Sequence, residues 1–292
     1  MADARTWLAG ARPRTWPASL VPPFVGTAAS DAAVEGAVVW WRAACALIVS
    51  LSLQIAVNYA NDYSDGVRGT DGTRVGPQRL VASGAATPAA VRSAAFAAFG
   101  VAAVFGLVVA AAVSWWLVAV GAASMLAAWC YTGGRRPYGY RGFGELFVFV
   151  FFGLVATAGS AFVQDGRLST LGIAASVPVG LGSVALLVSN NLRDLPTDAQ
   201  AGKRTLAVRM GDGPTRALYL VVVFVMVVSP LYLSLLRPWA LLALVAVVAA
   251  IAPVRAVLRG AAGSDLIRVL VATGRLQIAV GALLTLGLAL GT

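Results

Sequence analysis

Residues 43–65 read AACALIVSLSLQIAVNYANDYSD, an apolar run that ends in two asparagines and two aspartates. Residues 170–198 read TLGIAASVPVGLGSVALLVSNNLRDLPTD, and this second apolar run also ends in asparagines and aspartates. A run of roughly 20 apolar residues is long enough to cross the hydrocarbon core of a bilayer as a helix. We therefore expect two membrane helices that each carry carboxylates at one end.

The composition of the whole chain favours a membrane protein. Of its 292 residues, 59% are hydrophobic and only 12% are charged, whereas soluble domains carry about 25% charged residues. We predict an all-α membrane protein with nine transmembrane helices in one bundle, and residues 1–292 as a single domain. The apolar segments are 15–30, 43–61, 93–113, 116–133, 146–164, 170–190, 217–235, 239–254 and 276–291.

Basic residues outnumber acidic ones by 22 to 12, which gives a net charge of +10. A strongly basic soluble protein would suggest nucleic acid, but these residues lie between apolar segments and form no stripe, so we expect no nucleic-acid partner. When the loops are assigned alternately to two sides, one side has only Arg42, Arg167 and Arg237 and the other has 19 basic residues. The positive-inside rule then predicts a multi-pass cell-membrane protein with a cytoplasmic N-terminus.

The chain contains no histidine, and its two cysteines, Cys45 and Cys130, lie in separate apolar segments. These facts exclude haem ligation by histidine, zinc sites that contain histidine, and acid–base catalysis by imidazole. Any catalysis therefore depends on carboxylates, amides, tyrosines, arginines or Lys203, the only lysine.

Five of the twelve acidic residues gather after the two apolar runs. On a helix, Asn58, Asp62 and Asp65 share one face, and Asn190, Asp194 and Asp198 do the same. A carboxylate at the centre of a membrane helix costs about 2.5–3.5 kcal/mol, so such clusters near membrane depth need a cation. Oxygen ligands without His or Cys indicate Mg²⁺, which is commonly shared with substrate phosphates. The predicted metal ligands are Asp62, Asp65, Asp71, Asp194 and Asp198.

Paired Asp-rich helix ends that face each other would hold a diphosphate through bridging Mg²⁺. Cationic side chains near the motifs would bind the remaining oxygens and stabilise the negative charge of a leaving group. The candidates are Arg68, Arg135, Arg193, Lys203 and Arg204.

Four stretches of the chain resemble the UbiA-like intramembrane aromatic prenyltransferases. They are ARPRTWPA at 11–18, the first Asp-rich motif with GPQRLVASG up to residue 84, the stretch from YTGG at 131 to the FFG that ends at 153, and NNLRD to GKRTLA at 190–207. The resemblance covers nearly the whole chain and is greatest to the menaquinone-pathway branch. Asp71 follows Asp65 by six residues, where the general family pattern has four.

The resemblance implies a bundle around a central cavity that opens laterally to lipid, with the active site facing the cytoplasm. It implies Mg²⁺-dependent transfer of a polyprenyl group from polyprenyl diphosphate to 1,4-dihydroxy-2-naphthoate, with loss of diphosphate and carbon dioxide, giving demethylmenaquinone. Catalytic roles fall to Asp62, Asp65, Asp194, Asp198 and Lys203. The substrate-binding candidates are Arg14, Asn58, Asn61, Arg68, Tyr131, Arg135, Asn190 and Arg193. For Arg14 two roles stay open: it binds the acidic aromatic substrate, or it anchors the first membrane helix on the cytoplasmic side.

The sequence leaves two alternatives open. The acceptor of the same chemistry could be 4-hydroxybenzoate, homogentisate or another aromatic, and these are distinguished by which acid is consumed and whether carbon dioxide is released. A secondary transporter would place its ionisable groups near the bilayer midplane in broken helices. Here the acidic motifs lie at helix ends on one face, which favours an enzyme.

Overall fold

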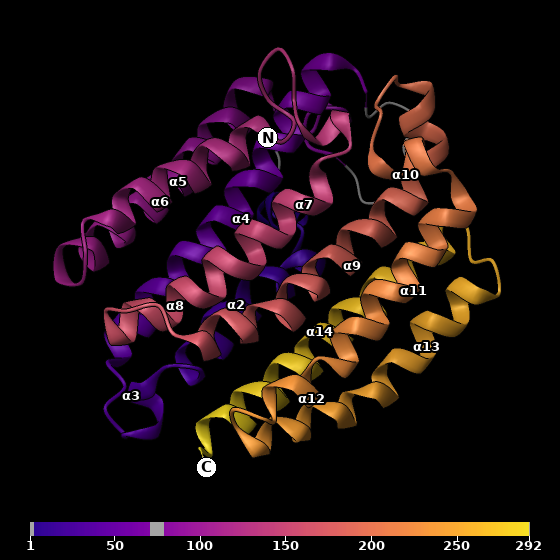
Figure 1. Ribbon diagram of the computed structural model, residues 1–292. Helices are drawn as coiled ribbons and strands as arrows, with labels where there is room; N and C mark the ends of the chain where they lie inside the picture. The colour runs from indigo at the N-terminus through magenta and orange to yellow at the C-terminus, as the bar shows by residue number, and fades with distance from the viewer. Residues whose placement is uncertain (1–2, 71–78, 292) are drawn as a thin grey trace.

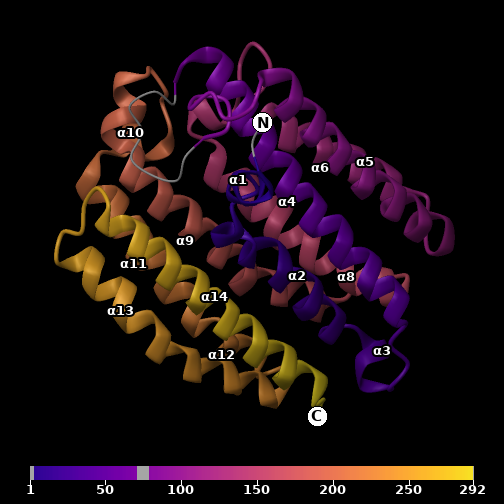
Figure 2. The same ribbon diagram turned by 180° about the vertical axis from the view of Figure 1, so that it is seen from behind.

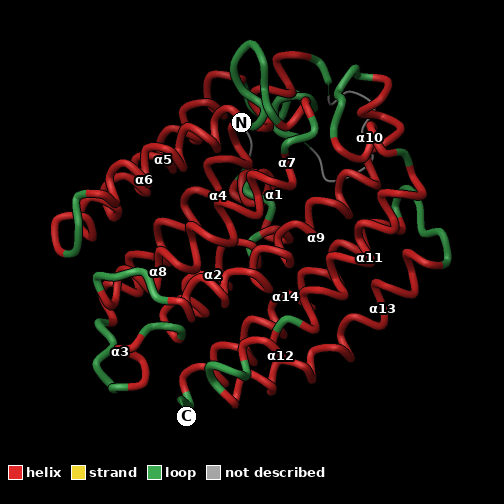
Figure 3. Tube along the Cα trace, in the orientation of Figure 1, coloured by secondary structure: helices red, strands yellow, loops and turns green. Residues whose placement is uncertain are grey.

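The computed structural model describes residues 3–70 and 79–291, and all regular secondary structure in these ranges is helical (Figure 3). Helices suit a chain this apolar, because a membrane segment must satisfy its backbone hydrogen bonds internally. The prediction of an all-α protein is confirmed for the described residues.

A helix or a helical unit lies in each predicted apolar segment, although α2 ends at Ala28 and α6 at Cys130, earlier than predicted. α7, η3 and α8 run on without a break, and η3 is a π-helical stretch within that unit. The main elements are α2 (Pro17–Ala28), α4 (Trp40–Arg68), α5 (Pro88–Ala112), α6 (Trp116–Cys130), α7 (Gly144–Val148), η3 (Phe149–Val155), α8 (Ala156–Asp165), α9 (Thr170–Gln200), α11 (Asp212–Val228), α12 (Pro230–Leu233), η4 (Pro238–Ala246), α13 (Val247–Leu258) and α14 (Asp265–Ala289). Five short helices complete the set: α1 (Ala4–Gly10), η1 (Pro13–Thr15), α3 (Asp31–Val34), η2 (Gly139–Arg141) and α10 (Leu206–Met210).

Seven helical units in the described ranges are long and apolar enough to cross a membrane. α6 is apolar but has 15 residues, and α2 has 12, fewer than the roughly 20 that a full span needs. The chain is therefore a multi-pass membrane protein, while the count of nine spans and the side of the membrane on which each end lies stay predictions.

The helices run side by side, with α5 and α6 on one flank and α11 and α13 on the other (Figure 1). The N-terminus, α10 and the connection from α6 to α7 lie at one end of the bundle, and α3, α12 and the C-terminus lie at the other, as the opposite view also shows (Figure 2). The last turns of α4 and α9 point to the end that carries the N-terminus. Both acidic motifs therefore lie at the same end of the bundle.

α9 is the central helix, since two thirds of its most apolar window is buried, more than in any other candidate span of the described chain. It packs against α11 and α14, and the core between them contains Met226, Leu276 and Leu284. A hydrogen bond of 2.6 Å between the hydroxyls of Tyr219 and Thr273 joins α11 to α14. This packing fixes the position of the second acidic motif at the end of α9.

Gly26 allows α2 to lie against α8. A Cβ at this position would be 2.2 Å from the carbonyl oxygen of Thr157 and 2.7 Å from Cβ of Ser160, so the two helices could not stay as close. Small residues at such contacts permit close approach of membrane helices.

We predict that Gly26→Ala lowers the thermal unfolding midpoint of the detergent-solubilised protein, because overpacking costs about 1–3 kcal/mol. Gly100→Ala is the matched control, since a Cβ at Gly100 on α5 meets no atom within 4 Å. Equal midpoints for the two variants would contradict this account of the α2–α8 contact.

Candidate active site

The last two turns of α4 bury the first acidic motif. Asp62 is fully buried, and its carboxylate accepts the backbone N–H groups of Leu80, at 2.9 Å, and Val81, at 3.0 Å. Asn58 is also buried and donates from Nδ2 to the carbonyl oxygen of Ala11, at 2.9 Å. These bonds fasten the segments before α2 and before α5 to the end of α4.

The last turns of α9 bury the second motif. Arg193 donates to both carboxylate oxygens of its neighbour Asp194, over 2.7 and 2.8 Å, and both side chains are buried. After α9 the chain reverses direction at Gly202. Its φ of 73° lies in the left-handed region, which glycine adopts without steric cost. The amide of Lys203 then bonds to the carbonyl oxygen of Asp198, at 2.9 Å, and the Lys203 side chain turns back toward the bundle.

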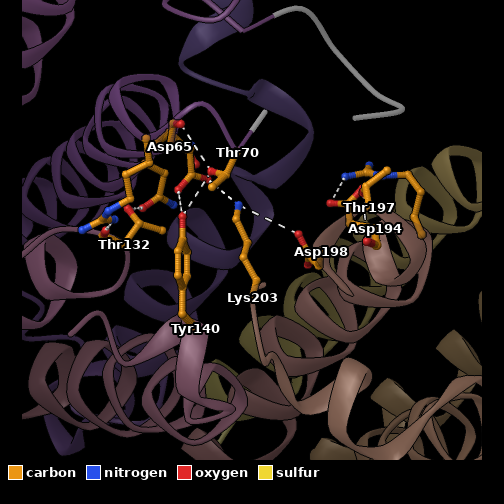
Figure 4. Close-up of polar contacts among 12 residues, drawn as sticks. Asp65, Thr70, Thr132, Tyr140, Asp194, Thr197, Asp198 and Lys203 are labelled. Atoms are coloured by element: carbon orange, nitrogen blue, oxygen red, sulfur yellow. Dashed lines mark hydrogen bonds and ion pairs between the residues drawn. The ribbon is translucent and has the colours of Figure 1, made fainter. Parts of the chain in front are cut away.

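Lys203 joins the two motifs (Figure 4). Its Nζ lies 3.1 Å from Oδ2 of Asp65 on α4 and 3.9 Å from Oδ1 of Asp198 on α9, and all three side chains are largely buried. The other oxygen of Asp65 accepts the hydroxyl of Tyr140, at 2.6 Å. Two segments more than 130 positions apart in the sequence therefore meet at one ammonium group.

Tyr140 comes from the connection between α6 and α7. Burial, and then the neighbouring carboxylate of Asp65, raise the pKa of the Tyr140 phenol above its ordinary value. The phenol therefore stays protonated at neutral pH and donates to Asp65. The ammonium of Lys203 also lies 4.9 Å from the centre of the Tyr140 ring, which is a favourable cation–π arrangement.

Arg68 and Asn61 hold the connection that carries Tyr140. The guanidinium of Arg68 donates to the carbonyl oxygens of Thr132 and Gly134 and lies 5.5 Å from the Tyr140 ring. The hydroxyl of Thr132 donates to Oδ1 of Asn61, at 2.7 Å. In this structure Arg68 therefore fastens a loop.

A cavity of about 900 Å³ opens beneath these groups. Along α4 it is lined from Asp65 down to Ala46, a length of about 28 Å at 1.5 Å per residue. Its deeper walls are mostly apolar and come from α4, α5, α6, η3, α8 and α9. The sequence-predicted residues that line the cavity are Arg14, Asn58, Asn61, Asp62, Asp65, Tyr131, Asn190, Arg193, Asp194, Asp198 and Lys203.

Three predicted cationic residues, Arg68, Arg135 and Arg204, do not line the cavity. Arg135 and Arg204 are exposed. Asp71 lies outside the described residues, so its predicted metal contact stays a prediction. The cavity lining also includes three polar residues that are not among the predicted site residues, namely Gln54, Thr132 and Asn191. Gln54 could have been found, because it lies one helical turn before Asn58 on the same face.

The described residues contain no group of three or more His, Cys, Asp or Glu side chains that could hold a metal by protein ligands alone. Mg²⁺ does not require such a group, since it usually binds one or two carboxylates together with waters and substrate phosphates. Asp65 on α4 and Asp198 on α9 both approach the ammonium of Lys203, so a single cation can lie between the two carboxylates. The donor set therefore fits Mg²⁺ that is shared with a phosphate ligand.

The fold and site define a multi-pass membrane protein with acidic helix ends above a deep apolar cavity. The chain belongs to the UbiA prenyltransferase family, whose model matches residues 19–290. It is 51% identical to the 1,4-dihydroxy-2-naphthoate octaprenyltransferase of Mycobacterium tuberculosis, over 94% of this chain and 93% of that protein. It is 46% identical to the protein of the same name from Mycobacterium leprae, over 98% of both chains. The resemblance inferred from the sequence is confirmed.

A solved structure of a UbiA homologue from Archaeoglobus fulgidus, bound to GPP and Mg²⁺, has the same fold. The TM-score is 0.61 over 96% of this chain and 99% of that one, with 12% sequence identity. A second structure of a UbiA homologue from that organism gives a TM-score of 0.64 over 97% and 99% of the two chains, at 14% identity. At these identities the likeness establishes the architecture alone.

We predict that Lys203→Ala strongly destabilises the metal-free protein, because removing one partner of a buried ion pair costs about 3–5 kcal/mol. The thermal midpoint should fall in EDTA and recover in part with Mg²⁺, since the metal can replace the lost positive charge. Arg268→Ala, which removes an exposed pair with Asp265, should change stability by less than about 1 kcal/mol. If the thermal midpoint of Lys203→Ala is the same with and without Mg²⁺, this result would contradict Asp65 and Asp198 as Mg²⁺ ligands.

Proposed function

We propose that this protein is a Mg²⁺-dependent aromatic prenyltransferase that joins a polyprenyl group from polyprenyl diphosphate to 1,4-dihydroxy-2-naphthoate. The observation that carries the proposal is the meeting of Asp65 and Asp198 at Lys203, directly above an apolar cavity. The names of the two mycobacterial relatives support the acceptor, and the ligands of the Archaeoglobus fulgidus homologue support the donor and the metal.

The acidic mouth of the cavity would bind the diphosphate. Asp65 and Asp198 are the leading candidates for direct contact with Mg²⁺, because one cation already lies between them. Asp62 and Asp194 accept hydrogen bonds on both carboxylate oxygens, from backbone amides and from Arg193 respectively, so they hold the two motifs in shape as well as adding negative charge. When bound, Mg²⁺ withdraws electron density from the diphosphate and so favours its departure.

The protein's own groups would then guide the transfer. The bond between the first prenyl carbon and oxygen breaks, and the diphosphate leaves with the electron pair, stabilised by Lys203 and Arg193. The apolar wall keeps water from the allylic cation. The electron-rich ring attacks this carbon to form the new carbon–carbon bond, and the ring carboxylate leaves as carbon dioxide while its bonding electrons return to the ring. No histidine base is required.

The long apolar part of the cavity suits the polyprenyl tail. We place the acidic mouth at the cytoplasmic face of the cell membrane, because the connections with most of the basic residues gather at that end of the bundle. Surrounding membrane lipid would contact the exposed apolar side chains of α5, α6, α11 and α13.

The direct test mixes purified protein with Mg²⁺, labelled polyprenyl diphosphate and 1,4-dihydroxy-2-naphthoate. We expect a prenylated product and carbon dioxide, both abolished by EDTA. Asp62→Ala and Asp194→Ala should abolish turnover in protein that still inserts into the membrane, and Lys203→Ala should slow it less severely. Asp212→Asn is the control, because this exposed carboxylate pairs with Arg216 outside the cavity and should leave turnover unchanged.

Wild-type turnover in either Asp→Ala variant would remove these residues from the site. Consumption of 4-hydroxybenzoate or homogentisate in place of the naphthoate would retain the prenyl transfer and change the acceptor. Transport of an anion without any prenylated product would overturn the enzyme assignment.

A second prediction concerns the tail. Gly121 on α6 lines the cavity, and a Cβ there would project into open space. We expect Gly121→Leu to lower kcat/KM about tenfold for long polyprenyl donors while sparing geranyl diphosphate, because the added side chain competes with the distal tail. Gly100→Leu, at an exposed glycine of α5 outside the cavity lining, should leave both donors unchanged. Equal effects on short and long donors would place the tail elsewhere.

A further inference from the structure

A buried carboxylate that the mechanism above does not use lies beside the cavity. Glu145 on α7 and Asn191 on α9 are each only 8% exposed. Nδ2 of Asn191 donates to Oε1 of Glu145, at 2.8 Å, while Oε2 of Glu145 is buried and has no hydrogen-bond partner among the described residues. Unsatisfied buried oxygens are rare in native proteins, so this one calls for an explanation.

The pair lies just below the acidic mouth. Asn191 precedes Asp194 by three residues, which places it about 4.5 Å deeper along α9, and it lines the cavity together with Tyr131. If the diphosphate is bound at the aspartates and the tail runs downward, the first prenyl carbon lies near this level. The aromatic ring must reach the same level for the new bond to form.

Packing alone does not account for the pair. A negative charge near the start of a helix is favourable, which explains why Glu145 is tolerated at the second position of α7. It does not explain why the side chain that donates to the carboxylate is an amide on the cavity wall. Gln277 gives a useful contrast: it is also buried with one unsatisfied oxygen, but it bonds to Ser183 to pack α14 on α9 and does not line the cavity.

The chemistry of the bond fixes the orientation of the Asn191 amide. Oε1 of Glu145 accepts from Nδ2, so the NH₂ group of Asn191 faces Glu145. The carbonyl oxygen Oδ1 then remains to accept a bond from a ligand. A ligand hydroxyl can donate to this oxygen, whereas an ionised ligand carboxylate, which only accepts hydrogen bonds, cannot. Arg12 and Arg14, which line the same cavity, supply positive charge for a carboxylate.

We infer that Asn191 accepts a hydrogen bond from a ring hydroxyl of the aromatic acceptor, and that Glu145 is the positioning residue that sets the Asn191 amide for this contact. The inference rests on the proposed function and deepens it. It defines a two-point recognition of a hydroxylated aromatic acid, with its hydroxyl at Asn191 and its carboxylate turned away from Glu145. The acceptor is thereby held in one orientation beneath the diphosphate.

The test measures donor and acceptor parameters separately in Glu145→Gln and Asn191→Leu. We expect the KM for dihydroxynaphthoate to rise about five- to tenfold in both variants, with the KM for polyprenyl diphosphate within twofold of wild type. Glu145→Gln keeps the size of the side chain, but the NH₂ group of the new amide can donate to Asn191. The Asn191 amide is then no longer held in one orientation. Gln277→Leu is the matched control and should leave both KM values unchanged.

Competitive inhibition gives a readout that general loss of packing would not produce. Two monohydroxy-2-naphthoates, each lacking one ring hydroxyl, are compared as inhibitors against the acceptor. Wild type should bind one of them several-fold less tightly than the other, and this preference should disappear in Asn191→Leu and shrink in Glu145→Gln. Equilibrium dialysis with labelled dihydroxynaphthoate repeats the comparison without turnover.

Acceptor KM values within twofold of wild type in both variants would overturn the inference, as would equal rises for donor and acceptor. Failure of the proposed function has a different signature, because wild type itself would then form no product from polyprenyl diphosphate and dihydroxynaphthoate. If wild type binds the naphthoate in dialysis and both variants bind it equally well, the inference fails whatever the reaction is.

Discussion

One buried ammonium group between two carboxylates organises the polar end of this protein. Lys203 meets Asp65 from α4 and Asp198 from α9, and Tyr140 completes the bonding of Asp65. Burying two carboxylates in a bundle this apolar is costly unless a cation lies between them. In the free protein the ammonium of Lys203 compensates the carboxylates of Asp65 and Asp198. The same two carboxylates would bind a divalent ion that is shared with a diphosphate.

The rest of the site keeps these charges in place. Asp62 and Asp194 use their oxygens on backbone amides and on Arg193, so the acidic motifs carry their own internal supports. Below them the cavity becomes apolar, apart from a few buried amides such as Asn191. Prenyl transfer needs two different environments. The polar mouth would stabilise the departing diphosphate, and the apolar interior would keep water away from the reactive cation.

Much of this arrangement could be predicted from the sequence. Apolar run length gave the helices, and helical spacing put each acidic motif on one face. Spacing within a helix says nothing about how a connection folds back, so Tyr140 as the partner of Asp65 and Arg68 as a loop anchor emerged only from the structure. The pairing of Glu145 with Asn191 could not be predicted either, because 46 positions and two helical elements, η3 and α8, separate the two residues.

The most direct measurement is an experimental structure of the protein with Mn²⁺ in place of Mg²⁺ and an unreactive polyprenyl diphosphate analogue, with the metal located by its anomalous scattering. We expect a metal that contacts carboxylate oxygens from both α4 and α9 and is shared with the diphosphate, with the tail in the apolar cavity. A metal held by only one of the two helix ends, or a diphosphate bound at the end that carries α3 and the C-terminus, would contradict this expectation.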